Sequence, residues 1–144
     1  MTITLEQANT IIGAALDHGG KAGFNPLTVA VLDPGGAVVA LARQDGSGFA
    51  RPDVATGKAY GVLALGMTNR QIAARAADSP EFFTSVAALA GGKIFTVPGG
   101  VLVRSASGEL LGAVGISGDA SLNDEAAAVA GIEAAGLTAV TGAE

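Results

Sequence analysis

The sequence predicts an α/β protein of the α+β kind, in which five short strands form one antiparallel sheet between helices. Three observations predict this fold. Short apolar runs are joined by turns of a few residues, which leave no room for the crossovers that parallel strands need. Segments with a helical spacing of apolar residues precede, interrupt and follow these runs. Helices on both faces of such a sheet give a three-layer α/β/α sandwich.

A helix and a hairpin are predicted for the first part of the chain. Thr4 can cap a helix that ends near the pair Gly19 and Gly20, and apolar residues recur along one face of it. Two strands are expected over residues 27–33 and 37–43. The Asp-Pro-Gly-Gly sequence between them is typical of a tight turn, so the two strands should be antiparallel neighbours.

Helices fill the middle of the predicted chain, and the sheet then resumes. The helices are expected over residues 53–66, 68–77 and 80–91. Three further strands are expected over residues 94–97, 101–104 and 109–117. A last helix begins at Ser121, with Asp124 three residues on as its capping-box partner. Because no repeat or linker interrupts the pattern, residues 1–144 are expected to form a single domain.

The composition excludes several classes of protein. The chain carries a net charge of −5 and no cluster of cations, which argues against nucleic-acid binding. It has no cysteine, so disulfides, thiolate chemistry and iron–sulfur clusters are excluded. Neither a secretory signal nor a stretch of transmembrane length is evident, so we expect a cytoplasmic protein without membrane contact. The mean hydropathy of +0.48 suggests that apolar surface is covered between copies of a homo-oligomer.

Several segments together carry a family resemblance. They are VAVLDPGGAVVALARQDG (29–46), Lys58-Ala59, VPGGVLV (97–103), LGAVGISG (111–118) and Asp124-Glu125. In this order and spacing they resemble the GlcG/HbpS family, which includes the C-terminal domain of PduO-type proteins. The resemblance implies a profilin-like fold, a homo-oligomer that is often octameric, and haem or another small ligand bound near subunit contacts.

His18 is the only histidine, and it lies beside the apolar face of the first predicted helix. A residue at this flank can meet a neighbouring copy of the chain and ligate haem iron as a metal ligand. The resemblance does not assign this role, because haem-binding members use a histidine outside the shared motif. Alternatively, His18 is a partly exposed residue whose charge the helix C-terminus favours. Tyr60 and Met67 are other conceivable axial ligands, and core packing also explains both.

Cationic side chains gather around the loop after the second predicted strand. Arg43 precedes Asp45 in this loop, and Arg51 and Lys58 follow it. A planar guanidinium and a lysine ammonium can hold a carboxylate, such as a haem propionate or a small organic acid. The family resemblance includes Asp45 and Lys58. The alternative is an ion pair between Arg43 and Asp45, with Lys58 in solvent.

Lys58, Asp124 and Glu125 are the candidate catalytic residues. The two carboxylates can act as general acid and base or bind a divalent cation, and a buried lysine with a lowered pKa can be a nucleophile. Adjacent residues of a helix point about 100° apart, so both carboxylates seldom face one substrate. The alternative is that they stabilise the start of the last helix through its dipole.

Glycine-rich turns supply the remaining candidates for ligand binding. Pro98, Gly99 and Gly100 form a predicted turn whose backbone N–H groups can line a pocket. Ser117, at the end of a predicted strand, can lie at the lip of that pocket. Glycines also recur at every third position over residues 112–118, but acidic residues follow them and would repel a phosphate. We therefore attribute these glycines to close packing rather than to a dinucleotide site.

Three functions from different classes remain open. The first is a homo-oligomeric protein that binds haem or another small ligand, and it predicts a haemin Soret band that His18→Ala weakens. The second is a cofactor-free hydrolase, lyase or isomerase that acts on a small carboxylated metabolite, and it predicts turnover that Lys58→Ala removes. The third is a purely structural subunit, which neither substitution would disturb.

Overall fold

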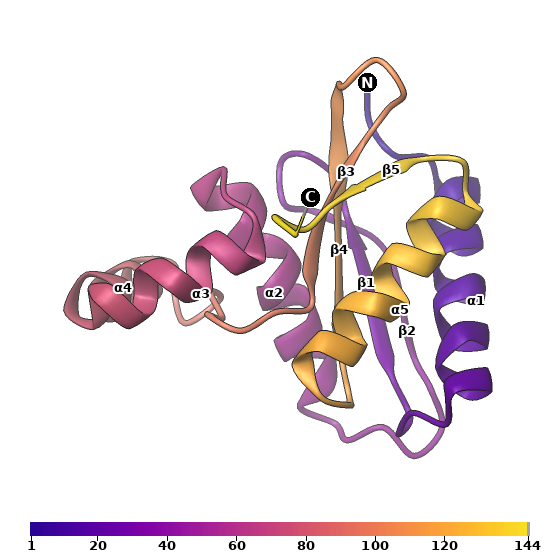
Figure 1. Ribbon diagram of the computed structural model, residues 1–144, viewed down its shortest axis with the longest axis horizontal. Helices are drawn as coiled ribbons and strands as arrows, with labels where there is room; N and C mark the ends of the chain where they lie inside the picture. The colour runs from indigo at the N-terminus through magenta and orange to yellow at the C-terminus, as the bar shows by residue number, and fades with distance from the viewer. Residues whose placement is uncertain (144) are drawn as a thin grey trace.

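The computed structural model of this chain describes residues 1–143, which contain five helices and five strands (Figure 1). In chain order these are α1 (Leu5–Ala22), β1 (Thr28–Leu32), β2 (Val38–Arg43), α2 (Arg51–Leu65), α3 (Asn69–Asp78), α4 (Pro80–Leu89), β3 (Gly100–Arg104), β4 (Leu110–Ser117), α5 (Ser121–Ala134) and β5 (Thr138–Val140). Along the described residues, no helix combines the length and the apolar character needed to cross a membrane.

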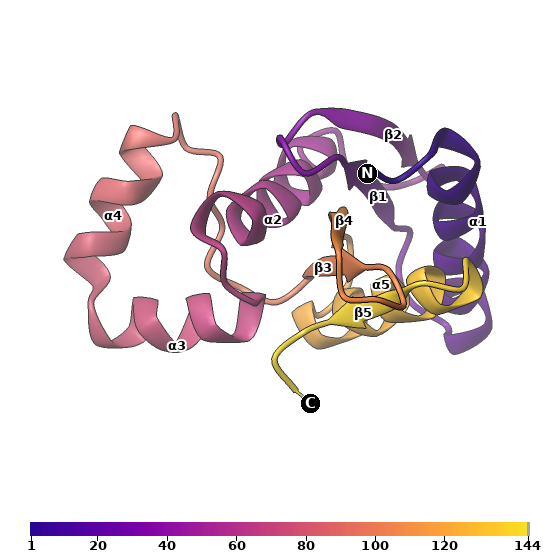
Figure 2. The same ribbon diagram turned by 90° about the horizontal axis from the view of Figure 1, so that it is seen from above.

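The strands form one sheet in the order β2-β1-β4-β3-β5, and every neighbouring pair is antiparallel. Helix α2 covers one face of the sheet, and α1 and α5 pack together on the other (Figure 2). Because helices cover both faces, the central strands β1 and β4 are buried almost throughout. The predicted three-layer sandwich with a five-stranded antiparallel sheet is confirmed. That the whole chain forms one domain stays a prediction.

The fifth strand is not the one that the sequence predicts. Residues 94–97 form no strand, because their apolar side chains pack against the small residues of α2 instead. A methyl group added at Gly61 would lie 3.5 Å from Cγ2 of Ile94, and one added at Gly57 would meet the ring of Phe95. The missing strand is β5, which follows α5 and pairs with β3. Its three residues carry too short a pattern to be recognised.

The first helix continues past its predicted end. Thr4 begins it with a capping box, in which the Gln7 N–H donates to the Thr4 hydroxyl and the Thr4 N–H donates to the Gln7 side chain. Gly19 lies inside the helix, where an added methyl group would come within 2.8 Å of Leu27. The helix ends at Gly23, whose φ of 75° is left-handed. The other predicted helices and strands end within two residues of the observed bounds.

The last helix begins at Ser121 as predicted, but the predicted capping box is wrong. Its N-cap is Ala120, and no side chain caps the helix. Asp124 is turned into the protein, where its carboxylate accepts hydrogen bonds from Lys58 and from the Asp119 N–H. The capping pattern and the buried contact use the same residue type, so sequence spacing alone did not separate them.

Helix α2 lies directly on the backbone of the sheet. A methyl group added at Gly115 would clash with the carbonyl of Ala55, and one added at Gly100 would clash with the carbonyl of Lys58. Only glycine permits an approach this close. The first half of α2 is therefore held over the start of β3 and the end of β4, with Lys58 between them.

Helices α3 and α4 project away from the sandwich (Figures 1 and 2). Ile72 and Phe83 anchor them in the core on the α2 side of the sheet. Phe82 and Leu89 have exposed fractions of 60% and 90%. Large exposed apolar side chains of this kind are typical of a surface that another molecule covers.

Candidate functional site

Most of the candidate residues lie at one end of the sheet, termed here the Thr28 end. Thr28 begins β1 and pairs with Arg43 at the end of β2 and with Ser117 at the end of β4. Strand β3 begins at the same end with Gly100, which pairs with Gly115 of β4. The loop into α2 and the turn into α5 follow directly, at the bottom of Figure 1. Residues from four strands and two helices therefore meet here.

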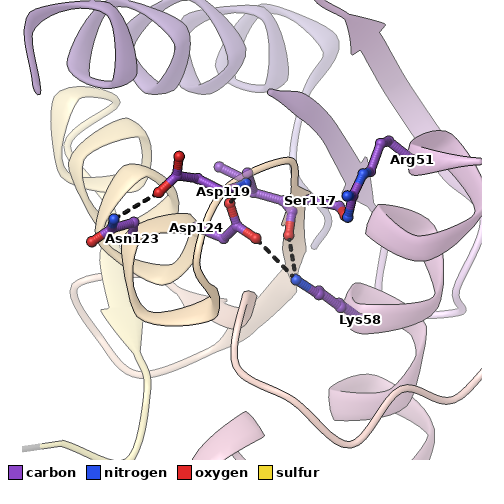
Figure 3. Close-up of polar contacts among 7 residues, drawn as sticks. Arg51, Lys58, Ser117, Asp119, Asn123 and Asp124 are labelled. Carbon is purple, nitrogen blue, oxygen red and sulfur yellow. Dashed lines mark hydrogen bonds and ion pairs between the residues drawn. The ribbon is translucent and has the colours of Figure 1, made fainter. Parts of the chain in front are cut away.

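Lys58 and Asp124 form a buried ion pair at the Thr28 end (Figure 3). The Lys58 Nζ donates to Asp124 Oδ2 at 3.1 Å and to the carbonyl oxygen of Ile116 at 2.9 Å. The two side chains are only 4% and 1% exposed. The pair thus joins α2 to β4 and α5, and removal of either partner would leave an uncompensated charge in the interior.

Asp119 connects this pair to the loop that follows α1. Its backbone N–H donates to Asp124 Oδ1 at 3.0 Å. Its own carboxylate accepts from the Asn25 N–H at 2.9 Å and from Asn123 Nδ2 at 2.7 Å (Figure 3). Asp124 therefore has hydrogen-bond donors on both carboxylate oxygens, and the turn between β4 and α5 has a fixed shape.

Burial shifts the pKa values of both partners in the pair. Loss of solvation lowers the pKa of Lys58, while the charge of Asp124 and their hydrogen bond oppose the shift and the charge of Arg51 adds to it. Burial also raises the pKa of Asp124, against the hydrogen bond from Asp119 and the charge of Lys58. Asp119 has a lowered pKa, chiefly because the Asn123 amide donates to its carboxylate. Burial thus disfavours the charged form of both partners, and their mutual attraction opposes this effect in each of them.

The turn over residues 98–100 covers Lys58 from the outside. Gly99 has a left-handed φ of 129°, and a methyl group added there would lie 2.7 Å from the Lys58 Nζ. The Gly99 carbonyl accepts from the Ile116 N–H at 2.9 Å, which fixes the turn on β4. Pro98 is half-buried just before it. The three predicted turn residues therefore lie at the site, where they separate the lysine from solvent.

The arginines of the loop lie at the edge of the same region. Arg51 Nη1 donates to the Ser117 hydroxyl at 2.9 Å, and Ser117 is fully buried. Arg43 is exposed, and its Nη1 makes a long contact of 3.5 Å with the Ser47 carbonyl. Asp45 is exposed and forms no ion pair with Arg43, so the alternative interpretation of these two residues is wrong.

Glu125 takes no part in the contact between Lys58 and Asp124. Its carboxylate accepts two hydrogen bonds from Arg70, one from Nη2 at 2.6 Å and one from Nε at 3.2 Å. This bidentate contact ties α5 to α3. The two adjacent carboxylates thus face different partners, as their angular separation on a helix predicts.

His18 lies on α1, which packs on the face of the sheet opposite α2. It is half-buried, and its ring meets Phe24 edge-to-face at a centroid distance of 5.8 Å. Neither imidazole nitrogen has a hydrogen-bond partner among the described residues. Tyr60 lines a pocket of about 100 Å³ beside the turn over residues 34–36, and Met67 packs at the edge of the core.

Sequence patterns did not identify Asn25, Asp119, Asn123 or Arg70 as parts of this region. The contact between Asp119 and Asn123 is the local one, because Asp119 directly precedes the N-cap of α5 and Asn123 lies in the first turn of that helix. Asn25 and Arg70 are joined to their partners across 94 and 55 positions of the chain. Contacts that distant leave no local pattern in a single sequence.

The antiparallel sandwich of this chain is similar to solved structures of other small α+β proteins. A PduOC:haem complex superposes with a TM-score of 0.85 at 20% identity, covering 98% of this chain and all of that one. Protein ORFY of Klebsiella pneumoniae superposes with a TM-score of 0.85 at 21% identity, and the match covers 94% of this chain and 92% of that one. A double mutant of Streptomyces reticuli HbpS superposes with a TM-score of 0.79 at 27% identity, and the match covers 92% of this chain and 86% of that one.

The family follows from the sequence itself. The model of the HbpS-like family, described as "haem degrading protein HbpS-like", matches residues 3–133. The chain therefore belongs to the HbpS-like family, as its resemblance to GlcG/HbpS proteins predicted. A search of proteins with curated descriptions found no match.

Proposed function

We propose that this protein binds haem as a homo-oligomeric, cytoplasmic accessory protein, with His18 as the axial ligand of the iron. The observation that carries the proposal is membership of the HbpS-like family. Two solved relatives support it: HbpS of Streptomyces reticuli, which is 27% identical in its mutant form, and PduOC, whose structure is a haem complex. Haem would supply an iron centre for redox or oxygen chemistry.

The chemistry of His18 fits this ligand. A histidine can bind iron only if a ring nitrogen is neither protonated nor engaged elsewhere, and no described residue competes for either nitrogen of His18. The side chain is partly exposed, so a porphyrin can reach it, and Phe24 fixes the ring by an edge-to-face contact. Tyr60 and Met67 are less suitable, because one adjoins a small pocket and the other packs against the core.

A second copy of the chain would complete the enclosure of the haem. Because His18 is half-buried on the outer helix α1, a planar ligand at its ring would lie on the surface of one copy and be covered by another. The exposed side chains of Phe82 and Leu89 are consistent with such assembly.

Haemin titration with His18→Ala tests the proposal. The wild-type protein should shift the Soret band at saturation, and the variant should bind at least about tenfold more weakly, because it loses a coordinate bond. Free imidazole added to the variant should restore the band, and Asp17→Asn on the neighbouring exposed position serves as control. Identical titrations of wild type and His18→Ala would refute the axial role, and a wild type without a Soret shift would refute haem binding.

A cofactor-free enzyme that acts on a small carboxylated metabolite is the second candidate. The feature that favours it is the buried pair, because perturbed pKa values of a lysine and an aspartate are typical of acid–base sites. Access to Lys58 would require the turn at Gly99 to open. Turnover of small esters or hydroxy acids should then be lost in Lys58→Ala at unchanged far-UV circular dichroism. Absence of wild-type turnover, or turnover that survives the substitution, would exclude this candidate.

A further inference from the structure

Three buried hydroxyl groups stand in a row at the Thr28 end, on the side of the sheet that α2 covers. Thr28, Ser47 and Ser117 are 0%, 7% and 0% exposed. The hydroxyls of Thr28 and Ser47 lie 2.9 Å apart. Thr28 and Ser117 are directly paired across β1 and β4, so their side chains point to the same face of the sheet. The row is a fixed polar base beneath the loop that leads into α2.

An arginine lies at each end of this row. Arg43 pairs with Thr28 on the other side of β1 and contacts the Ser47 carbonyl, and Arg51 donates to the Ser117 hydroxyl. The groups that the two arginines contact, the Ser47 carbonyl and the Ser117 hydroxyl, are both neutral. A guanidinium has five N–H donors, and each arginine uses one of them in these contacts. The remaining donors are available to a ligand.

Neither arginine forms an ion pair within the described part of the chain, although Asp45 and Asp53 are two residues away in sequence and exposed. The charge of Lys58 is matched by Asp124. Asp119 also lies at this end, and its carboxylate accepts from Asn25 and Asn123 rather than from an arginine. Both guanidinium groups are therefore without a carboxylate partner among the described residues.

An exposed aromatic residue lies between the two arginines in the sequence. Phe49 is 89% exposed and lies two residues before Arg51, in the loop that crosses the Thr28 end. The Arg51 stem turns back over this loop, since a methyl group added at Gly48 would lie 3.9 Å from its Cγ. The Arg51 N–H donates to the Gly48 carbonyl at 3.0 Å, which holds the loop and the helix start together. A guanidinium and an aromatic face are thus presented on one short segment.

We infer that Arg43, Arg51 and Phe49 form a binding site for the carboxylate of a planar aromatic ligand. The two guanidinium forks take the carboxylate oxygens, because their planar donor geometry matches that group. Phe49 takes the ring, which would cover an aromatic surface that is otherwise in water. The Ser117 hydroxyl holds Arg51, and Arg43 contacts the backbone carbonyl of Ser47. The site needs no iron and does not involve His18, so it goes beyond the proposed haem ligation.

Titration with 2-naphthoate, followed by amide NMR spectra of the oligomer as purified, tests this site. The expected shifts map to residues 43–51 and to Ser117. Arg43→Gln and Arg51→Gln should each weaken binding by about tenfold or more, the usual effect of losing a charge-assisted hydrogen bond. Arg51→Lys keeps the positive charge but loses the planar guanidinium, so its affinity for 2-naphthoate should lie between those of the wild type and Arg51→Gln. Arg104→Gln is the matched control, because that exposed arginine contacts the Gly108 carbonyl in the turn between β3 and β4 and should change nothing.

Further probes separate the parts of the inference. Acetate should bind more weakly than 2-naphthoate, and Phe49→Ala should reduce that difference. His18→Ala should bind 2-naphthoate like the wild type even if it no longer binds haemin, so the two proposals can fail separately. Shifts that map elsewhere, 2-naphthoate affinities unchanged in both glutamine variants, or inorganic phosphate binding as tightly as 2-naphthoate would each overturn the site. The dispersion of the amide spectra shows that each variant is folded.

Discussion

Replacing Lys58 by methionine tests whether the buried pair is held together by charge. Methionine keeps an unbranched apolar stem but removes the ammonium group. The Asp124 carboxylate, 1% exposed, would then be left in the interior with the Asp119 N–H as its remaining hydrogen-bond donor. Removal of one partner of a buried ion pair typically costs about 3–5 kcal/mol of unfolding free energy. We expect a loss of that size at pH 7.

A second substitution separates the charge from the packing. Asp124→Asn in the Lys58→Met background removes the stranded charge while an amide oxygen still accepts from the Asp119 N–H. The double variant should therefore lose clearly less than the sum of the two single losses, with a coupling energy on the order of 2 kcal/mol between the two positions. Asp124→Asn alone should be destabilised as well, because the buried ammonium loses its counter-charge.

Urea unfolding followed by far-UV circular dichroism, at one protein concentration, measures all four proteins of this cycle. Linear extrapolation gives the unfolding free energies, and equal m-values would show that the variants unfold from comparable native states. The reasoning would be refuted if Lys58→Met cost less than about 1 kcal/mol, which is the value of an exposed pair. It would also be refuted if the double variant lost the sum of the two single losses.

Two further measurements follow from the same structure. Gly115→Ala should lower the free energy of unfolding by about 1–3 kcal/mol, because its methyl group meets the Ala55 carbonyl. Gly13→Ala should raise it by about 0.4–1 kcal/mol, because the methyl group there meets nothing within 4 Å. Urea unfolding that ranks the two variants otherwise would contradict the packing of α2. Acidification should favour the wild type relative to Asp124→Asn. Burial raises the pKa of Asp124 above its value in the unfolded chain, so between these two pKa values the native state binds more protons than the unfolded state. The native state is therefore stabilised as the pH falls through the raised pKa. If the difference in unfolding free energy between the wild type and Asp124→Asn shrank on acidification, this sign would be wrong.

The fold could be predicted because its main signals are local. The Asp-Pro-Gly-Gly turn dictates an antiparallel hairpin, and the capping boxes at Thr4 and Thr68 mark helix starts. The prediction of the fifth strand failed where local signals are ambiguous. A short apolar run such as residues 94–97 suits a buried strand or a segment that packs on a helix, and the small residues of α2 decide between them. Strand β5 is only three residues long and owes its pairing to β3.

The candidate site could be predicted residue by residue but not as an arrangement. The sequence predicts Lys58 and Asp124 as candidate catalytic residues, yet their direct contact spans 66 positions of the chain. Sequence alone also gave no sign that a lysine on α2 is buried, because charged residues are seldom buried without a partner. The partner becomes evident only when the register of β4 and the start of α5 are known. The hydrogen bond between Arg51 and Ser117 likewise joins residues that are 66 positions apart in the chain.

Closely packed glycines bring these charged groups together. Gly115 lets α2 rest on β4, and Gly100 lets β3 begin beneath the carbonyl of Lys58. Gly99 then leaves just enough room for the ammonium group, since a methyl group there would lie 2.7 Å from it. A larger residue at any of these positions would lift the helix and lengthen the contact with Asp124. Close backbone packing and the electrostatics of the Thr28 end are therefore one property of this fold, because the small residues set the distance at which the charges meet.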